Sequence, residues 1–265
     1  FNVDVGELWQ YRDLILLFVK RDFVAIYKQT ILGPLWYLIQ PLMTTLVFAI
    51  IFNQIAKLST DGMPALLFYL SGIVVWRYFA DCLQKTANTF VGNASLFGKV
   101  YFPRLVVPIS VIISNLISFS IQLALFACFW LYYKYQGVGI QLNAAVFLMP
   151  FLVLHMATLG LGCGIIISSL TTKYRDLAQL VGFGVQLWMF LTPIVYPTSI
   201  IPDKWKWCIV LNPMTPVVES FRFIFLGVGA VNGWSLIMSA LAATVILFIG
   251  VMLFSRIEKN FMDTV

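Results

Sequence analysis

Four ionisable side chains stand in otherwise apolar stretches of this 265-residue sequence. Arg77 and Asp81 are four residues apart, and Glu219 and Arg222 are three apart, so each pair can share one face of a helix. Two opposite charges that meet offset much of the cost of leaving water. For Arg77 and Asp81 we favour a structural ion pair, whereas for Glu219 and Arg222 a structural pair and a functional role are both open.

Other patterns that could carry chemistry are incomplete. The segment 92–99 (GNASLFGK) is close to a phosphate-binding loop, but five residues separate its glycines, and Val100 stands where Ser or Thr would bind Mg²⁺. His155 has no carboxylate nearby in sequence, so a hydrogen bond to a neighbouring helix explains it better than a metal or a proton relay. The four cysteines form no C-x-x-C pair. We expect no catalytic site, metal or cofactor in this chain, so any ATP and Mg²⁺ must be bound by another subunit.

The composition defines the elements that must position these residues. With 61% hydrophobic residues, 11% charged residues and a mean hydropathy of +0.92, the chain is typical of an all-α integral membrane protein. A helix that crosses the ~30 Å hydrocarbon core needs roughly 20 apolar residues. Residues 1–265 are therefore predicted to form one transmembrane domain with six spans, at about 33–56, 64–84, 105–133, 142–170, 177–196 and 233–254.

The distribution of Lys and Arg predicts the orientation. If both termini are cytoplasmic, 11 of the 17 Lys and Arg lie in cytoplasmic segments and four lie outside, with Arg77 and Arg222 inside apolar sequence. The net charge of +6 therefore reflects membrane topology, and we expect no nucleic-acid partner. Residues 7–28 mix apolar and charged side chains as an amphipathic helix at the membrane surface does. The loop 86–104 is predicted to contain a short amphipathic helix that a soluble partner can bind.

The segment from Thr192 to Pro216 interrupts the pattern of spans, because it carries five of the 11 prolines. Each proline removes a backbone donor, so this segment cannot be one continuous helix in lipid. Broken backbone at this depth needs protein or a water-filled cavity to satisfy its polar groups, which makes the segment a candidate lining or gate of a transport path.

Aromatic side chains gather in the span before this break. Phe183, Trp188, Phe190 and Tyr196 accompany two glutamines and two glycines there, a mixture poorly suited to facing lipid on every side. Aromatic faces with nearby amide groups can bind sugars, although anchoring at the membrane interface is the ordinary role of Trp and Tyr.

Several motifs together resemble the permease subunits of ABC exporters for lipid-linked polysaccharides, the family that exports O-antigen, capsule and teichoic acid. The resemblance extends over nearly the whole chain. In order, the motifs are residues 27–36 (YKQTILGPLW) with Pro41, residues 102–104 (FPR) with Pro108, residues 174–177 (YRDL), residues 192–196 (TPIVY), residues 212–214 (NPM) and Arg222.

The resemblance implies a homodimer joined to two copies of an ABC ATPase in the bacterial cytoplasmic (inner) membrane. The complex would move an undecaprenyl-pyrophosphate-linked glycan to the outer face, and this subunit would not itself be an enzyme. The resemblance also implies an interface helix near 7–22, a coupling helix near 87–98 and two short re-entrant helices between spans five and six, in about 197–228.

Residue roles follow from the resemblance as hypotheses. Lys20, Arg21 and Lys28 either attract the lipid pyrophosphate or are solvated positive-inside charges. Arg175 and Asp176 either clamp helix ends during the cycle or form a structural ion pair. The remaining assignments are channel lining by Tyr37, Phe183, Trp188, Phe190 and Tyr196, an exit region at Glu219 and Arg222, and contact with the ATPase through Asn88, Phe90, Asn93, Leu96, Phe97 and Lys99.

Two other classes of protein remain open. A polyprenyl-sugar membrane transferase would need convergent carboxylates, histidine or a metal site, and the 11 acids here are scattered. A proton-coupled flippase of lipid-linked glycans would show an unpaired acid within a span, and the sequence reveals none clearly.

Overall fold

The computed structural model describes residues 5–28, 32–93, 102–171, 177–229 and 231–262, which are helical and contain no strand. The prediction of an all-α membrane protein is confirmed. The α-helices are α1 (Val5–Gln10), α2 (Arg12–Lys28), α3 (Trp36–Phe48), α4 (Ala65–Ala87), α5 (Thr89–Gly92), α7 (Val106–Tyr135), α8 (Met149–Thr171), α9 (Leu177–Leu191), α10 (Asp203–Leu211), α11 (Thr215–Leu226) and α12 (Gly233–Met262). Shorter helical turns are η1 (Gly33–Leu35), η2 (Ala49–Ile55), η3 (Ala144–Leu148) and η4 (Thr198–Ile200).

Five helical segments in the described ranges are long and apolar enough to cross a membrane. A sixth is reached if α10 and α11 are counted as one broken span, and these two helices meet at an angle of 95°. The five segments are Gly33–Ile55, Ala65–Ala87, Val106–Tyr135, Ala144–Thr171 and Gly233–Arg256.

Helix α9 differs from the span predicted at 177–196. It has 15 residues and ends at Leu191, so it is about 22 Å long at 1.5 Å per residue, against a hydrocarbon core of ~30 Å. Residues 192–196 instead form turns. Pro193 explains the early end, because its ring disfavours helical backbone at Thr192 and it has no N–H to continue the helix.

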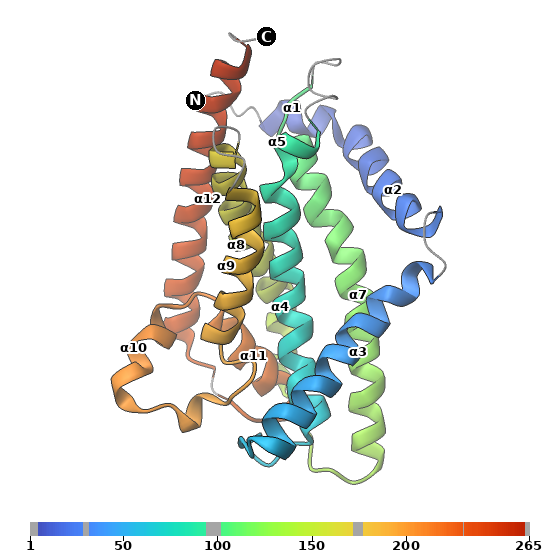
Figure 1. The fold of residues 1–265 in the computed structure, drawn as a ribbon, viewed down its shortest axis with the longest axis vertical. Helices are drawn as coiled ribbons and strands as arrows, with labels where there is room; N and C mark the ends of the chain where they lie inside the picture. The colour runs from blue at the N-terminus through green and yellow to red at the C-terminus, as the bar shows by residue number, and fades with distance from the viewer. Residues whose placement is uncertain (1–4, 29–31, 94–101, 172–176, 230, 263–265) are drawn as a thin grey trace.

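Helix α4 lies at the centre of the fold, with 83% of its apolar window buried. Helices α7, α8, α9 and α11 pack around it, and α3 crosses it (Figure 1). Helix α8 also packs along α12. Gly160 and Gly164 of α8 allow its close approach to α4, because a Cβ at Gly164 would stand 2.5 Å from the Cβ of Thr86 on α4. Small residues at such contacts are typical of helices that associate in membranes.

The N-terminal helices pack on the start of α7. A buried cluster that includes Ile15, Phe18 and Val19 of α2 joins them to Phe102 and Val106. The sequence predicted one helix near 7–22, but the structure has two, with a break at Tyr11. In Figure 1, α1, the start of α7 and the C-terminal end of α12 all lie at one end of the molecule.

Candidate transport path

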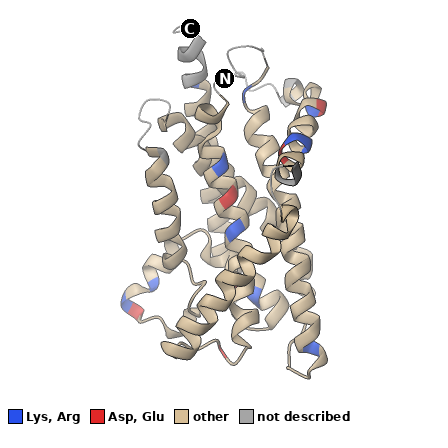
Figure 2. Cartoon of the chain, turned by 45° about the vertical axis from the view of Figure 1, so that its right-hand side comes forward, with Lys and Arg blue, Asp and Glu red and all other residues tan. Residues whose placement is uncertain are grey.

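Three charged residues, Arg77, Asp81 and Lys85, follow one another at four-residue intervals on α4, so they lie along one side of the helix. An acidic position thus lies between two basic ones, and Figure 2 shows a red band between two blue ones along a helix in the middle of the molecule. Arg77 donates from Nη2 to Oε1 of Gln40 on α3 at 2.7 Å. Lys85 donates from Nζ to Oδ1 of Asn115 on α7 at 2.6 Å. Both cations are therefore held by amide side chains of neighbouring helices.

The predicted ion pair between Arg77 and Asp81 is wrong for this structure. No ion pair within 4.0 Å joins them in the described part of the chain, and no hydrogen bond to the Asp81 carboxylate is found there. The reason is that the Arg77 side chain extends across to α3, where Gln40 accepts its hydrogen bond. Asp81 is left partly exposed.

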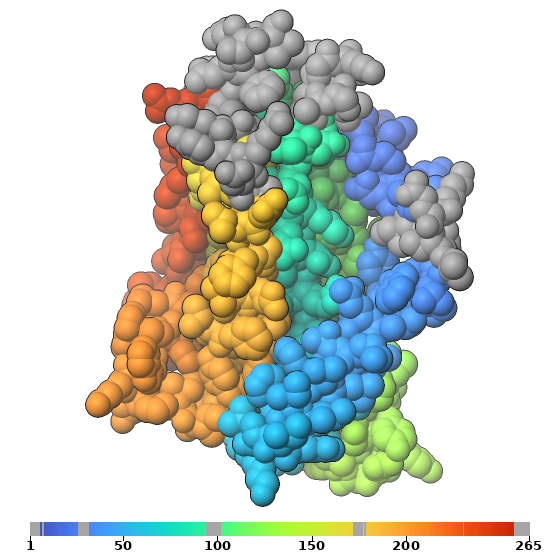
Figure 3. Space-filling model, viewed as in Figure 1, coloured from blue at the N-terminus to red at the C-terminus, as the bar shows by residue number. Residues whose placement is uncertain are grey.

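The side of α4 that bears these charges is incompletely covered by the chain itself. Arg77 and Asp81 are partly exposed, and Lys85 and Gln40 are exposed. On the face shown in Figure 3, atoms of α4 remain visible between α9 and α3. We call Gln40, Arg77, Asp81 and Lys85 the polar strip.

Arg222 of α11 fastens the broken backbone after α9. Its side chain is 1% exposed, and Nη1 and Nη2 donate to the carbonyl oxygens of Pro193 and Ile194 at 2.6 and 2.7 Å. The guanidinium carbon stands 3.7 Å from the centre of the Phe68 ring. Gly72 of α4 makes room, because a Cβ there would be 3.1 Å from Nη2. The freed carbonyls are thus satisfied by protein, as broken backbone at membrane depth requires.

The hypothesis that Glu219 and Arg222 belong to an exit region stays a prediction. In the single chain Arg222 is enclosed and donates to backbone carbonyls. Glu219 is 7% exposed, and its Oε2 accepts a hydrogen bond from the Thr198 hydroxyl at 3.1 Å. Both side chains hold the segment between α9 and α11 against the body of the protein.

Asn212 is a second fastening of this segment, and the sequence analysis assigned it no role. Its Oδ1 accepts from Nε1 of Trp188 at 3.1 Å and from the N–H of Met214 at 3.0 Å. Its Nδ2 donates to Oγ1 of Thr192 at 2.9 Å. One amide therefore joins the end of α9 to the connection between α10 and α11. The sequence did offer one indication of this role, because Asn212 precedes Pro213 and asparagine side chains often bind the backbone of a turn.

His155 is held by neighbouring elements, as the sequence analysis favoured. Its Nε2 lies 3.0 Å from Oγ of Ser239 on α12, and that hydroxyl donates to the Pro213 carbonyl at 2.6 Å. Within the described ranges, no group of three or more His, Cys, Asp or Glu side chains could hold a metal ion.

The aromatic residues predicted to line a channel do not share one surface. Trp188 packs on Trp76 and Phe79 of α4, with ring centres 6.2 and 5.0 Å away, so its ring faces inward. Phe183 and Phe190 are 60% and 43% exposed on α9. Of the five predicted lining residues, these two are the exposed ones.

The remaining two predicted lining residues are less exposed. Tyr37 is partly exposed on α3. The hydroxyl of Tyr196 donates to the carbonyl of Phe190 at 3.1 Å. Tyr196 therefore also fixes the turn that follows α9.

The three cations proposed to attract a pyrophosphate lie on α2. Lys20 is exposed. Arg21 contacts Asp22 at 2.9 Å and lies over the Phe18 ring at 4.8 Å, so its charge is partly matched within the chain. Lys28 ends α2, and its side chain lies outside the described part of the structure.

The predicted coupling segment is described only in part. Phe90 is 4% exposed, stacks on Phe254 at 4.5 Å and donates its N–H to Ser168 Oγ at 3.3 Å, so its ring is not on the surface that a partner would contact. Asn88 is exposed and Asn93 is partly exposed. Five other residues with predicted roles lie outside the described ranges: Leu96, Phe97, Lys99, Arg175 and Asp176.

Comparison with known proteins gives a consistent result. The model of the family described as ABC-2 type transporter matches residues 13–226. The O-antigen export system permease protein RfbA of Myxococcus xanthus is 29% identical over 263 residues, which is 98% of each chain. RfbA of Klebsiella pneumoniae is 26% identical over 251 residues, covering 95% of this chain and 94% of the relative. The polysialic acid transport protein KpsM of Escherichia coli is 24% identical over 233 residues, covering 86% and 87%.

Proposed function

Because this chain belongs to the ABC-2 type transporter family, we propose that it is the membrane-spanning subunit of an ATP-driven exporter of polysaccharide. Relatives named as O-antigen export permeases and as a polysialic acid transport protein align over most of its length, which supports this function. The chain lies in the bacterial cytoplasmic membrane and has no catalytic site of its own. A separate ABC ATPase binds and hydrolyses ATP with Mg²⁺.

The cargo in this proposal is an undecaprenyl-pyrophosphate-linked glycan of the O-antigen, capsule or teichoic acid type. The working assembly is a homodimer with two ATPase subunits. The modest size of the chain supports a dimer, because five to six spans are few to enclose a polysaccharide by themselves.

The polar strip is the observation that carries the proposal. A charged side chain at the centre of a membrane span costs about 2.5–3.5 kcal/mol on insertion scales, and such residues face a bundle interior or a water-filled cavity rather than lipid. Arg77, Asp81 and Lys85 lie on a candidate span and are not enclosed by the chain. A hydrated path along this side of α4, completed by the second copy, meets that requirement and accommodates a hydrophilic cargo.

The orientation and accessory elements belong to the same proposal. Both termini are cytoplasmic, since the positive-inside pattern places most Lys and Arg on their side. Helices α1 and α2 lie at the membrane surface, and the segment that includes α5 receives the movement of the ATPase. Helices α10 and α11 form a re-entrant pair on the outer side, which their 95° bend supports.

Reconstitution with the partner ATPase tests the function. Vesicles that contain both subunits should move a lipid-linked polysaccharide to the opposite leaflet only with hydrolysable ATP, and should do so without a pH gradient. Neutralising the strip with Asp81→Asn or Arg77→Gln should lower the transport rate about tenfold, because the hydrated face loses its charge pattern. The matched control is Asp13→Asn, since the side chain of Asp13 is 89% exposed on α2. A lower transport rate in the control, or an unchanged rate in the strip variants, would contradict this assignment.

One observation favours a second candidate, a proton-coupled flippase. Asp81 is an acid in a span without an ion-pair partner in the described structure, which is the feature that such a carrier needs. The same vesicles distinguish the two mechanisms. Transport by this chain alone, driven by a pH gradient and abolished by Asp81→Asn, would support the flippase and reject the exporter.

A further inference from the structure

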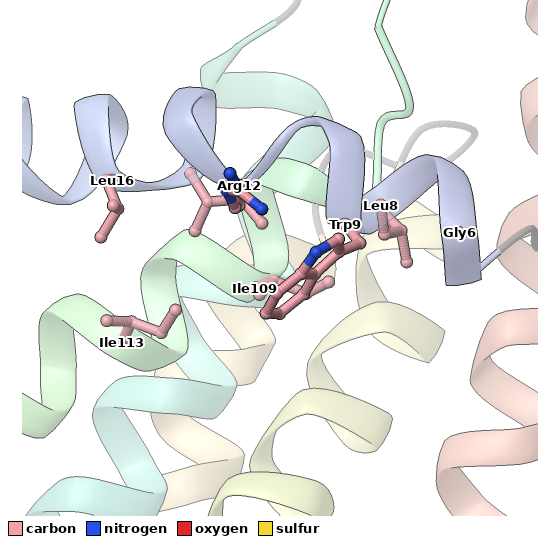
Figure 4. A pocket seen from close by; sticks show the side chains of 8 residues that line it. Gly6, Leu8, Trp9, Arg12, Leu16, Ile109 and Ile113 are labelled. Atoms are coloured by element: carbon pink, nitrogen blue, oxygen red, sulfur yellow. The ribbon is translucent and has the colours of Figure 1, made fainter.

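A hollow of about 740 Å³ lies beneath α1 and α2, against the first turns of α7 (Figure 4). Its volume falls within the ~300–1,000 Å³ typical of small-molecule sites. None of the residue roles predicted from the sequence involves this hollow. The residues that line it include Leu8, Trp9, Arg12, Leu16, Ile109 and Ile113.

The walls of this hollow are apolar except at one position. Trp9 and Leu16 are 69% and 60% exposed, although both are large hydrophobic side chains. Arg12 is the only charged residue among the lining side chains. In Figure 4 its guanidinium lies close to α2, while Ile109 and Ile113 extend from α7 below it. The hollow therefore offers one cation beside a largely apolar surface.

The guanidinium of Arg12 is available to a ligand. Among the side chains that the structure describes, the carboxylate nearest to it is Asp13, at 3.9 Å from Nε, and the two side chains are 60% and 89% exposed. An exposed pair at this distance contributes little. The guanidinium also stands 5.5 Å from the centre of the ring of Trp9, which lines the same hollow. The part of the chain that the structure describes shows no hydrogen bond from this guanidinium, so its donors can reach a ligand.

The depth of the hollow matches the boundary between head groups and acyl chains. Ile109 and Ile113 belong to the first two turns of the 30-residue α7, so they lie within roughly 10 Å of its start at 1.5 Å per residue. Trp and Arg are typical of this boundary, where an apolar body meets a polar surface.

We propose that the hollow binds one anionic glycerophospholipid of the surrounding leaflet, with its phosphate on Arg12 and one acyl chain along Trp9, Leu16 and Ile113. The charge favours this ligand over a lipid diphosphate. A phosphodiester carries one negative charge, which Arg12 matches, whereas a diphosphate would leave charge unmatched among apolar walls. The bound lipid stabilises the packing of α2 on α7. The site is independent of what the protein transports.

Quenching of Trp9 by brominated lipid tests the site in the full-length chain. In nanodiscs, the quenching due to Trp9 is the difference between the wild type and Trp9→Phe. We compare two mixtures: brominated phosphatidylglycerol in phosphatidylcholine, and brominated phosphatidylcholine in phosphatidylglycerol. The mole fraction of brominated lipid that gives half of this quenching should be about tenfold lower in the first mixture. A tenfold difference is the effect of one charge-assisted hydrogen bond. Arg12→Gln should abolish the difference. The control Arg21→Gln should preserve it, because Arg21 does not line the hollow.

Two further measurements can overturn the proposal. Ile113→Phe fills the hollow but keeps Arg12, so it should weaken the selective quenching; unchanged selectivity would mean contact at the open surface only. Undecaprenyl diphosphate should not displace brominated phosphatidylglycerol at equal concentration. Displacement, or equal quenching by both lipids in the wild type, would reject the phospholipid site while leaving the proposed export function intact.

Discussion

At the scale of single residues, Arg222 shows how this protein accommodates a charge at membrane depth. Its planar guanidinium donates to two adjacent carbonyls that have lost their helical partners, and it lies over an aromatic ring. The fork of donors in arginine fits two acceptors at once, which a lysine ammonium cannot reproduce. The charge therefore stabilises the turn after α9.

Replacing Arg222 should destabilise the fold. Arg222→Gln should lower stability by about 3 kcal/mol or more, because two buried carbonyls lose charged donors. Arg222→Lys should recover only part of this loss. Thermal unfolding in detergent, followed by helicity, measures both variants. Arg21→Gln is the exposed control, and equal unfolding temperatures for Arg222→Gln and wild type would contradict the role assigned to Arg222.

Asp81 should be accessible to water. In a background without the four native cysteines, Asp81→Cys should react with a membrane-impermeant, charged thiol reagent, because the polar strip borders a hydrated path. Val245→Cys on α12 is the matched control, since Val245 is 56% exposed but lies on an apolar helix surface. The rate at position 81 should exceed that at 245 at least tenfold. Equal rates would place the polar strip away from water.

At the scale of elements, close helix contacts depend on glycine at defined positions. Gly164 of α8 faces Thr86 of α4, and Gly162 faces α12, where a Cβ would come 2.7 Å from the N atom of Leu247. Neither contact leaves space for a methyl group. One helix can therefore approach two partners because its small residues alternate between them.

Gly164→Ala should separate α4 from α8. The added Cβ would stand 2.5 Å from Thr86 Cβ and 2.9 Å from the Leu83 carbonyl, and such overpacking costs about 1–3 kcal/mol. Gly182→Ala on α9 is the control, since nothing lies within 4 Å of its Cβ. That substitution should be neutral or stabilising by up to about 1 kcal/mol. Calorimetry of both variants checks the contrast, and a stable Gly164→Ala would argue against tight packing here.

The turn after α9 should loosen when Asn212 is removed. Asn212→Ala deletes the bonds to Trp188, Thr192 and Met214. Amide hydrogen exchange in residues 191–196 and 212–216 should then accelerate, whereas exchange in α4 should change little because its burial does not depend on this side chain. Unchanged exchange in both segments would show that the other contacts, which include those of Arg222 and Tyr196, hold the turn without Asn212.

At the scale of the whole molecule, the single chain leaves charged side chains exposed on a surface that lipid would not solvate. The polar strip is partly exposed beside α9, which also presents Phe183 and Leu187 outward. A second copy over this side would exclude lipid from the charges and leave a hydrated path between the copies. The proposed dimer therefore rests on the same observation as the proposed function.

The purified exporter should contain two copies of this chain and two ATPase subunits. Light scattering of the detergent-solubilised complex, corrected for bound detergent, measures this directly against a chain mass of 30.0 kDa. A complex with one copy of this chain that still transports would reject the shared path, although the family membership would stand.

The sequence by itself determined the solvent, the positions of five long apolar helices and the place where the chain breaks. These properties are local: hydropathy accumulates along a span, and the proline at 193 ends α9 wherever the neighbouring helices lie. The family motifs could also be identified from the sequence alone, because they are runs of adjacent residues.

Only the tertiary structure decided which side chains meet. Four-residue spacing put Arg77 and Asp81 on one face of α4, but a long side chain reaches across a helix interface, so Arg77 bonds to Gln40. Trp188 and Phe90 are compatible with a surface role in sequence, yet packing turned both inward. Arg222 lies three residues from Glu219 and finds its acceptors 28 and 29 positions away. Contacts between helices depend on how whole faces fit together, and residue spacing within one helix does not contain that information.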